Sequence, residues 1–271
     1  MQKIILLSGH SQRFLNEGFT VKPLISIDQK LIIDYVIESI KSNGEENFNN
    51  YIFIVKKSDI INYKIDSILL EKFPQSRVIS IDDHRNGPVF SIKQIFNLID
   101  DNSEVVISYC DLYIKWNFDD FILFARESQS DGSIVSHINF HPHRINNQYF
   151  AYLKVDNNKV LQIKEKSYFT DDPDSEYASG GIYFFKKGSY VKKYFQHIID
   201  IDDKINNEFY VTLVYNHMIK DNLNITHFDS KNYVCLGTPM DVKIFQSFLT
   251  INKFIPLEML IKTANYFKQY E

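Results

Sequence analysis

The first strand of the chain is predicted from a short run that is apolar at every position, Ile4 to Leu7. Four residues are too few for a helix with its own period, and unbroken hydrophobicity is typical of a parallel strand covered on both faces. Further buried strands are predicted at 51–55, 76–81 and 104–110. The pattern therefore predicts a sheet whose central strands are covered on both sides.

Helices are predicted between these strands, because apolar residues recur there at helical spacing. The predicted helices cover 31–41, 60–73, 88–99, 117–127 and 190–199, and two amphipathic helices end the chain at 242–249 and 257–267. Residues 150–166 instead indicate a β-hairpin with its turn at Asn157 and Asn158. Strands over 132–140 and 177–186 complete the predicted elements.

A polar loop follows the first strand and carries small residues and cations. Gly9 and Ser11 add almost no side-chain bulk, whereas Arg13 and Lys22 add positive charge. Loops at the carboxyl end of a first parallel strand bind nucleotides in open α/β sheets, since their backbone N–H groups can point at phosphate oxygens. Small polar loops after strands are also common. The local residues therefore allow two interpretations, a phosphate-binding loop and an ordinary loop that follows a strand.

Asp111 directly follows the strand predicted at 104–110, which places its carboxylate at the same edge of the sheet as the polar loop. Mg²⁺ is commonly held by one or two carboxylates together with phosphate oxygens, so a metal ligand is one interpretation. An aspartate that caps a helix or a turn is the other. His141 and His143 leave a similar choice between a metal pair and turn histidines beside a substrate pocket.

Composition narrows the class of protein. The 271 residues, 44% of them hydrophobic, suit one large α/β domain, and the net charge of −4 argues against a surface built for nucleic acid. Cys110 and Cys235 lie far apart without C-x-x-C spacing, which argues against a disulfide framework or a thiolate zinc site. No run reaches the roughly 18 apolar residues of a membrane span, and the sequence becomes polar too early for a signal peptide. We expect a cytoplasmic protein with no membrane partner.

Three short motifs stand in one order along the chain: S-G-x-S-x-R-F from Ser8, V-K-P-L-I-x-I from Val21, and L-G-T-P from Leu236. They resemble the signatures of sugar-phosphate nucleotidyltransferases of the glucose-1-phosphate thymidylyltransferase and mannose-1-phosphate guanylyltransferase type. The resemblance covers about residues 3–245. It implies an α/β, Rossmann-like (GT-A-like) three-layer sandwich with a mostly parallel central sheet, helices on both faces and a small β-hairpin lid.

The resemblance also implies a role for individual residues. The residues implied in nucleotide binding are Leu7, Ser8, Gly9, His10, Ser11, Gln12, Arg13, Lys22, Gly87 and Asp111. Of these, Arg13, Lys22 and Asp111 are implied to be catalytic, Asp111 as the ligand of Mg²⁺ and Gly87 as a contact of the base. The residues implied in acceptor binding are Glu165, Lys166, Ser179, Gly180 and Glu208.

Several positions depart from the family's pattern. Ser11 replaces a second glycine, Val21 and Leu31 replace prolines, Ala151 replaces a glycine before the hairpin, and Cys235 replaces an aspartate that is a second metal ligand. A buried neutral thiol is a poor ligand for Mg²⁺. Asp111 is therefore expected to be the principal protein ligand, with Asp229 as the alternative source of a second carboxylate.

The function implied by the resemblance is Mg²⁺-dependent transfer of a nucleotidyl group from a nucleoside triphosphate to a sugar phosphate or another small phosphorylated acceptor. Pyrophosphate would be released, and the product would serve the synthesis of surface polysaccharide precursors, for capsule or lipopolysaccharide. Two alternatives are a GT-A glycosyltransferase, although Asp111-Leu112-Tyr113 does not form its D-x-D motif, and a non-catalytic nucleotide-binding protein. We expect a nucleotidyltransferase domain over 1–245. A helical extension over 246–271 would pack on this domain or form a homodimer contact.

Overall fold

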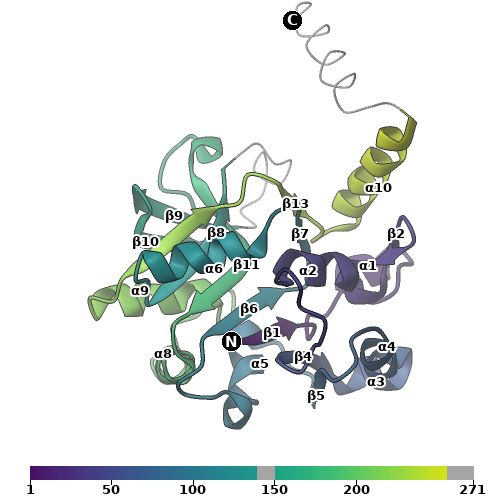
Figure 1. Cartoon of the computed structure of the whole chain (residues 1–271), viewed down its shortest axis with the longest axis horizontal. Coiled ribbons are helices and arrows are strands. Elements are labelled where there is room, and N and C mark those ends of the chain that lie inside the picture. Colours follow the sequence, from purple (N-terminus) through teal and green to yellow (C-terminus); the bar gives the residue numbers. More distant parts are fainter. Residues whose placement is uncertain (139–149, 255–271) are drawn as a thin grey trace, which may run out of the picture.

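Within the residues that the computed structural model describes, 1–138 and 150–254, nine strands form the main sheet (Figure 1). Along the sheet these strands stand in the order β5 (Arg77–Ile81), β4 (Tyr51–Lys56), β1 (Gln2–Leu6), β6 (Val105–Tyr109), β11 (Tyr177–Phe185), β8 (Gly132–His137), β12 (Ile225–Asp229), β10 (Lys159–Glu165) and β9 (Ala151–Asp156). Two short ribbons pair separately, β2 (Ser26–Ile27) with β3 (Lys30–Leu31) and β7 (Leu112–Ile114) with β13 (Tyr233–Cys235).

The main sheet is mixed, and the predicted mostly parallel sheet is not confirmed. Strand β1 runs parallel to β4 and β6, and β4 runs parallel to β5. Strand β11, however, runs antiparallel to β6, β8 and β9, and β10 runs antiparallel to β9 and β12. The prediction failed because β11 is buried along nearly its whole length, so its sequence carries no sign of its direction. A run of apolar residues reports burial on both faces but not the direction of the strand.

The predicted hairpin is present as β9 and β10, with Asn157 at φ 51° in its turn. Strand β10 also pairs with β12, and β9 also pairs with β11. The hairpin therefore continues the main sheet at its edge, and a separate lid is not confirmed.

Helices cover both faces of the sheet. Their bounds are α1 (Gln12–Asn16), α2 (Ile32–Ile40), α3 (Lys57–Tyr63), α4 (Ile65–Lys72), α5 (Pro88–Lys93), α6 (Phe118–Glu127), α8 (Gly188–Asp200), α9 (Val211–Lys220) and α10 (Pro239–Phe254). One buried core joins the sheet to α2, α4 and α6, and a second joins it to α5, α8 and α9. Within β1, Ile5 belongs to the first core, whereas Ile4 and Leu6 belong to the second. The arrangement agrees with the three layers expected from the sequence.

Most helix positions follow the prediction, and the differences have local causes. Asn117 caps α6 as expected, since its side chain accepts the N–H of Asp119 at 3.3 Å. The helix predicted over 60–73 is divided into α3 and α4, because Lys64 adopts a left-handed conformation with φ 51°. The helix predicted over 88–99 ends at Lys93 and is followed by a short 3₁₀ turn.

The C-terminal helix α10 spans the predicted domain boundary between residues 245 and 246. Its Val242 and Phe245 are buried in the first core, and Gln246 accepts the N–H of Asp28 at 3.0 Å. Figure 1 shows α10 projecting from the rest of the molecule beside β2. The histidines at 141 and 143 and the helix predicted over 257–267 lie outside the described residues. No helix in the described part of the chain is both long and apolar enough to cross a membrane.

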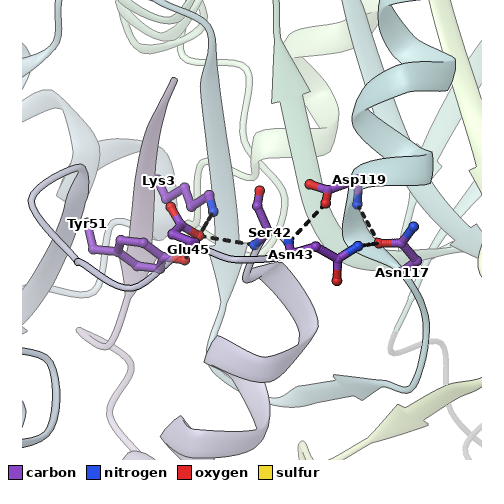
Figure 2. Close-up of polar contacts among 7 residues, drawn as sticks. All are labelled: Lys3, Ser42, Asn43, Glu45, Tyr51, Asn117 and Asp119. Atoms are coloured by element: carbon purple, nitrogen blue, oxygen red, sulfur yellow. Dashed lines mark hydrogen bonds and ion pairs between the residues drawn. The ribbon is translucent and has the colours of Figure 1, made fainter.

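A buried ion pair holds the segment between α2 and β4 against the sheet (Figure 2). Lys3 is 1% exposed, and its Nζ donates to Glu45 at 2.5 Å and to the hydroxyl of Tyr51 at 3.0 Å. The Tyr51 hydroxyl and the N–H of Ser42 also donate to Glu45. Burial lowers the pKa of Lys3, and the Glu45 carboxylate opposes that shift. The pair therefore keeps Lys3 charged in a position that would otherwise exclude it.

We expect Lys3→Met to lower the free energy of unfolding by about 3 kcal/mol, the low end for a broken buried pair, because Glu45 is partly exposed. Lys30→Met is the matched control. Lys30 pairs with Glu38 on the surface, and its loss should cost less than about 1 kcal/mol. Chemical denaturation of both variants checks this, and equal losses would contradict a structural role for the buried pair.

Candidate active site

Two cavities adjoin at the edge of the sheet where β1 and β6 end. The loop cavity, about 280 Å³ in volume, is lined by Leu6, Ser8, Gly9, His10, Lys22, His84, Arg85, Gly87, Pro88, Ser91, Tyr109, Cys110, Asp111, Glu208 and Tyr210. The hairpin cavity, about 260 Å³ in volume, is lined by Arg13, Lys22, Tyr109, Asp111, Phe150, Ala151, Glu165, Lys166, Ser179, Gly181, Tyr183, Tyr210, Tyr233, Cys235, Gly237 and Thr238. Lys22, Tyr109, Asp111 and Tyr210 line both cavities, so the two form one cleft with a shared boundary.

An ion pair stands at this boundary. Lys22 Nζ lies 3.0 Å from Asp111 Oδ2, and the two side chains are 17% and 33% exposed. Loss of hydration acts to lower the pKa of Lys22. The charge and hydrogen bond of Asp111, together with smaller effects of Cys110 and Cys235, outweigh it and raise that pKa to about 12. A permanent positive charge therefore faces both cavities.

The loop after β1 is tied to Lys22 through Ser11. Ser11 has φ 52°, a left-handed conformation that favours glycine, and it stands where the resembled family has its second glycine. Its hydroxyl accepts the N–H of Lys22 at 3.0 Å. This hydrogen bond offsets part of the backbone strain, which explains how a serine is accommodated at this position.

The segment before α5 is joined to the segment before α9 by their backbones. Phe209 donates its N–H to Asn86 O at 2.9 Å, and Val89 donates its N–H to Phe209 O at 3.1 Å. Gly87 lies between them with φ 86°, and a methyl group there would come within 2.7 Å of Phe209 N. Glycine is therefore needed at position 87 for the contact of two backbones as well as for its φ angle.

A chain of polar groups crosses from the hairpin cavity toward the loop cavity. Lys166 Nζ donates to the hydroxyl of Tyr210, and this hydroxyl donates to the Glu208 carboxylate. Lys166 Nζ also lies 3.9 Å from Glu208 Oε2 and 4.5 Å from the centre of the Tyr210 ring. The hairpin and the segment before α9 are thus held together by a charged network.

Glu165 is the last residue of β10, and it lines the hairpin cavity. Burial raises its pKa to about 7, although the hydroxyl of Thr212 donates to it at 2.5 Å and opposes the shift. Nearby, the Ser179 hydroxyl lies 3.0 Å from that of Tyr183. Gly181, with φ 78°, accompanies a break in the register between β11 and β8.

Comparison with known proteins identifies the family. The family model described as "Nucleotidyl transferase" matches residues 2–255. The chain belongs to the nucleotidyl transferase family. This finding confirms the resemblance drawn from the motifs. No curated protein matches the chain.

Solved structures of low sequence identity share the fold. A nucleoside-diphosphate-sugar pyrophosphorylase from Vibrio cholerae RC9 is 18% identical with a TM-score of 0.72, over 90% of this chain and 99% of that one. A candidate glucose-1-phosphate thymidylyltransferase from Bacillus anthracis is 16% identical with a TM-score of 0.68, over 92% and 94% of the two chains. The inositol-1-phosphate CTP transferase from T. maritima is 14% identical with a TM-score of 0.66, over 93% and 96%.

The structure brings most of the predicted site residues of this nucleotidyl transferase family member into the cleft. Those that line the loop cavity are Ser8, Gly9, His10, Lys22, Gly87, Asp111 and Glu208, and those that line the hairpin cavity are Arg13, Lys22, Asp111, Glu165, Lys166 and Ser179. Glu208 was expected on the acceptor side but lines the loop cavity, because Phe209 is bonded to Asn86 there.

Four predicted residues do not line either cavity. Leu7 is 1% exposed and belongs to the first core, and Gln12 points outward to bond with Asn16. Ser11 supports Lys22 from behind, and Gly180 packs against Val135 and Tyr233. Leu7, Ser11 and Gly180 therefore lie behind the surface of the cleft, and Gln12 lies on the outside of the loop.

The sequence analysis did not identify the aromatic residues that line the cleft or a group of polar residues in the loop cavity. The aromatic residues are Tyr109, Phe150, Tyr183, Tyr210 and Tyr233, and the polar ones are His84, Arg85 and Ser91. Tyr109 could have been predicted to line the cleft, because it lies only two residues before Asp111. His84 and Arg85 directly precede the Asn86-Gly87-Pro88 turn, but nothing in their spacing marks them as facing β1.

The donors in the cleft fit a magnesium ion held through one protein carboxylate. Asp111 lines both cavities, with its Oδ2 paired to Lys22 at 3.0 Å, whereas Asp241 lines neither and accepts the N–H and the hydroxyl of Thr238, both at 2.8 Å. Loss of hydration raises the pKa of the Cys235 thiol well above its usual range, so it stays protonated. Asp229 lines neither cavity. No group of three or more acidic, histidine or cysteine side chains within residues 1–138 and 150–254 has the arrangement of a metal site.

We expect Gly87→Ala to lower the free energy of unfolding by roughly 3 kcal/mol, since such a φ costs about 1–3 kcal/mol in strain and each displaced hydrogen bond adds about 1 kcal/mol. Gly44→Ala is the matched control, because Gly44 has φ 71° but open space around its Cβ position. Strain alone should cost about 1–2 kcal/mol there. Denaturation curves that show the same loss in both variants would contradict the backbone contact with Phe209.

Proposed function

We propose that this chain transfers a nucleotidyl group from a nucleoside triphosphate to a sugar phosphate or another small phosphorylated acceptor, and releases pyrophosphate. The observation that carries the proposal is the cleft of two cavities that meet at the Lys22–Asp111 pair. The loop cavity suits the nucleoside, and the hairpin cavity suits the acceptor. The family membership and the names of the structural neighbours support the same reaction class.

In this reaction an oxygen of the acceptor phosphate attacks the α-phosphorus of the nucleotide. A new phosphorus–oxygen bond forms, the bond from the α-phosphorus to the bridging oxygen breaks, and pyrophosphate leaves with the electron pair. All reacting groups are anionic, so catalysis requires positioning and charge neutralisation rather than a protein nucleophile. Lys22 would neutralise charge at the boundary, and Arg13 would stabilise the departing pyrophosphate. Lys166 would bind the acceptor phosphate, with Glu165 at its hydroxyl groups.

Asp111 would hold Mg²⁺ together with phosphate oxygens and water. Magnesium keeps several waters and commonly binds through one carboxylate plus substrate phosphates, so the missing second carboxylate at Cys235 does not exclude it. When bound, the ion would supply neutralisation of phosphate charge. The role in surface polysaccharide synthesis belongs to the same proposal and depends on which acceptor is used.

The function is tested by incubating the protein with each of the four common nucleoside triphosphates and a panel of sugar and polyol phosphates, while pyrophosphate release is followed with Mg²⁺ and with a chelator. We expect one pair of substrates to release pyrophosphate only with the metal present. Asp111→Asn should lower that turnover at least about 100-fold. Cys235→Ser should leave turnover within about threefold. Turnover lost in Cys235→Ser but kept in Asp111→Asn would overturn the assignment of the metal ligand.

The raised pKa of Glu165 predicts a pH dependence of both stability and acceptor binding. The folded state disfavours its carboxylate form, so the cost of ionisation is absent below about pH 4.5 and complete above pH 7. Glu165→Gln should therefore raise the melting temperature at pH 8 but change it little at pH 4.5. The exposed Glu127→Gln is the control and should raise it at neither pH.

For the wild-type protein, the acceptor KM should rise as the pH falls through about 7, because a protonated Glu165 accepts fewer hydrogen bonds from acceptor hydroxyls. The rise should be smaller in Glu165→Gln, in which the acceptor phosphate still titrates over this range but residue 165 does not. A wild-type acceptor KM that does not change between pH 8 and pH 6 would show that Glu165 does not bind the acceptor as a carboxylate.

A further inference from the structure

A chain of three hydrogen-bonding side chains crosses the wall of the loop cavity, from the segment before α5 to the loop after β1. His84 Nε2 lies 3.0 Å from Ser91 Oγ, and Ser91 Oγ lies 2.8 Å from Ser8 Oγ. All three residues line the cavity. A second contact joins the same two segments, since His10 Nε2 lies 2.8 Å from the carbonyl oxygen of His84.

The backbone around His84 determines which ring nitrogen carries the proton. The N–H of Asn86 donates to His84 Nδ1 at 3.2 Å, so Nδ1 acts as an acceptor and has no proton of its own. The proton of the neutral ring is therefore on Nε2, which must donate to Ser91. Burial lowers the pKa of His84, and the nearby His10 acts in the same direction against an opposing effect of Asp83. The neutral ring is thus the dominant form at neutral pH.

The direction of the next hydrogen bond follows from the burial of Ser91, which is 1% exposed. Ser91 accepts from His84, so its own hydroxyl proton needs an acceptor. Within the described residues its hydroxyl bonds only to His84 and Ser8, which leaves Ser8 Oγ as that acceptor. An unmet buried hydroxyl would be costly. Ser91 therefore donates to Ser8, and the proton of Ser8 is left to donate into the loop cavity.

We propose that His84, acting through Ser91, fixes the Ser8 hydroxyl as a hydrogen-bond donor to the base of the bound nucleotide. The inference rests on the proposed function, which places the nucleoside in the loop cavity. The charge of the lining residues indicates where the phosphates and the base of the nucleotide lie in this cavity. The phosphates belong with Lys22 at the boundary, whereas Ser8 and Ser91 present an uncharged wall to the base.

The ligand chemistry is therefore a nucleobase that turns an acceptor, a carbonyl oxygen or a ring nitrogen, toward Ser8. Ser8 contacts the base directly, whereas Ser91 and His84 are positioning residues that set the direction of its proton. Such a wall favours a base with an acceptor at this point, because a base that turns an N–H group there would leave the Ser8 proton without a partner in the cavity.

The test begins with the nucleoside triphosphate that the wild-type protein binds most tightly among the four common ones, in the presence of Mg²⁺. We expect Ser8→Ala to weaken its binding by roughly three- to tenfold, the loss of one uncharged hydrogen bond. Ser91→Ala and His84→Phe should weaken it by the same or a smaller factor, with a matching rise in the nucleotide KM. Ser58→Ala is the matched control. Ser58 bonds to Asp83 beside His84 but lies outside the chain of three, so binding should not change.

Two further measurements separate this role from simple structural support. The double variant Ser8→Ala, Ser91→Ala should bind no more weakly than Ser8→Ala alone, because Ser91 acts only through Ser8. Inorganic tripolyphosphate should compete equally well against the wild-type protein and Ser8→Ala. Additive losses would show that Ser91 supports the wall independently, and weaker competition by tripolyphosphate would place Ser8 on the phosphates. Either result overturns the proposal.

The outcomes also separate this inference from the function on which it rests. Pyrophosphate release with unchanged nucleotide binding in Ser8→Ala would overturn the chain of donors and leave the nucleotidyltransferase standing. A wild-type protein that binds none of the four triphosphates would overturn both.

Discussion

The ion pair between Lys22 and Asp111 is the contact on which the cleft depends. It joins the loop after β1 to the end of β6, and it is the charged part of the boundary between the two cavities. Its cost in lost hydration is offset by the mutual attraction of the two charges. An anion that enters from either side therefore meets a cation that is already in place, so little reorganisation is needed at the moment of reaction.

The surrounding structure holds each side of this pair in place. Ser11 fixes the backbone of Lys22, and Gly87 allows the segment before α9 to pack against the segment before α5. Through Tyr210 that segment reaches Lys166 on the hairpin. The walls of both cavities are thus connected by hydrogen bonds.

The sequence predicted the layers and most element positions, because burial leaves a clear record in the spacing of apolar residues. It did not predict the direction of β11, since a strand covered on both faces reads the same in either direction. It also did not predict that Glu208 lines the loop cavity. That position depends on the backbone contact between Phe209 and Asn86, which joins residues more than 120 positions apart and leaves no local pattern.

The residues of the cleft fall into two groups, those that the sequence predicted and those that it did not, for a physical reason. Asp111 and Lys22 could be placed from the sequence because Asp111 directly follows a predicted buried strand and Lys22 lies within a recognisable motif. Ser91 could not, since a serine on the buried face of a short helix looks like any other core position. Its importance lies in two neighbours, Ser8 and His84, that only the fold brings together.

A crystal structure of the protein with its preferred nucleoside triphosphate and Mg²⁺ would decide where the nucleotide lies. We predict that the α-phosphate is bound beside Lys22, that the metal is bound by Asp111, and that the base lies in the loop cavity against Ser8. A nucleotide whose base lies in the hairpin cavity, between Phe150 and Tyr233, would contradict the division of the cleft proposed for this enzyme.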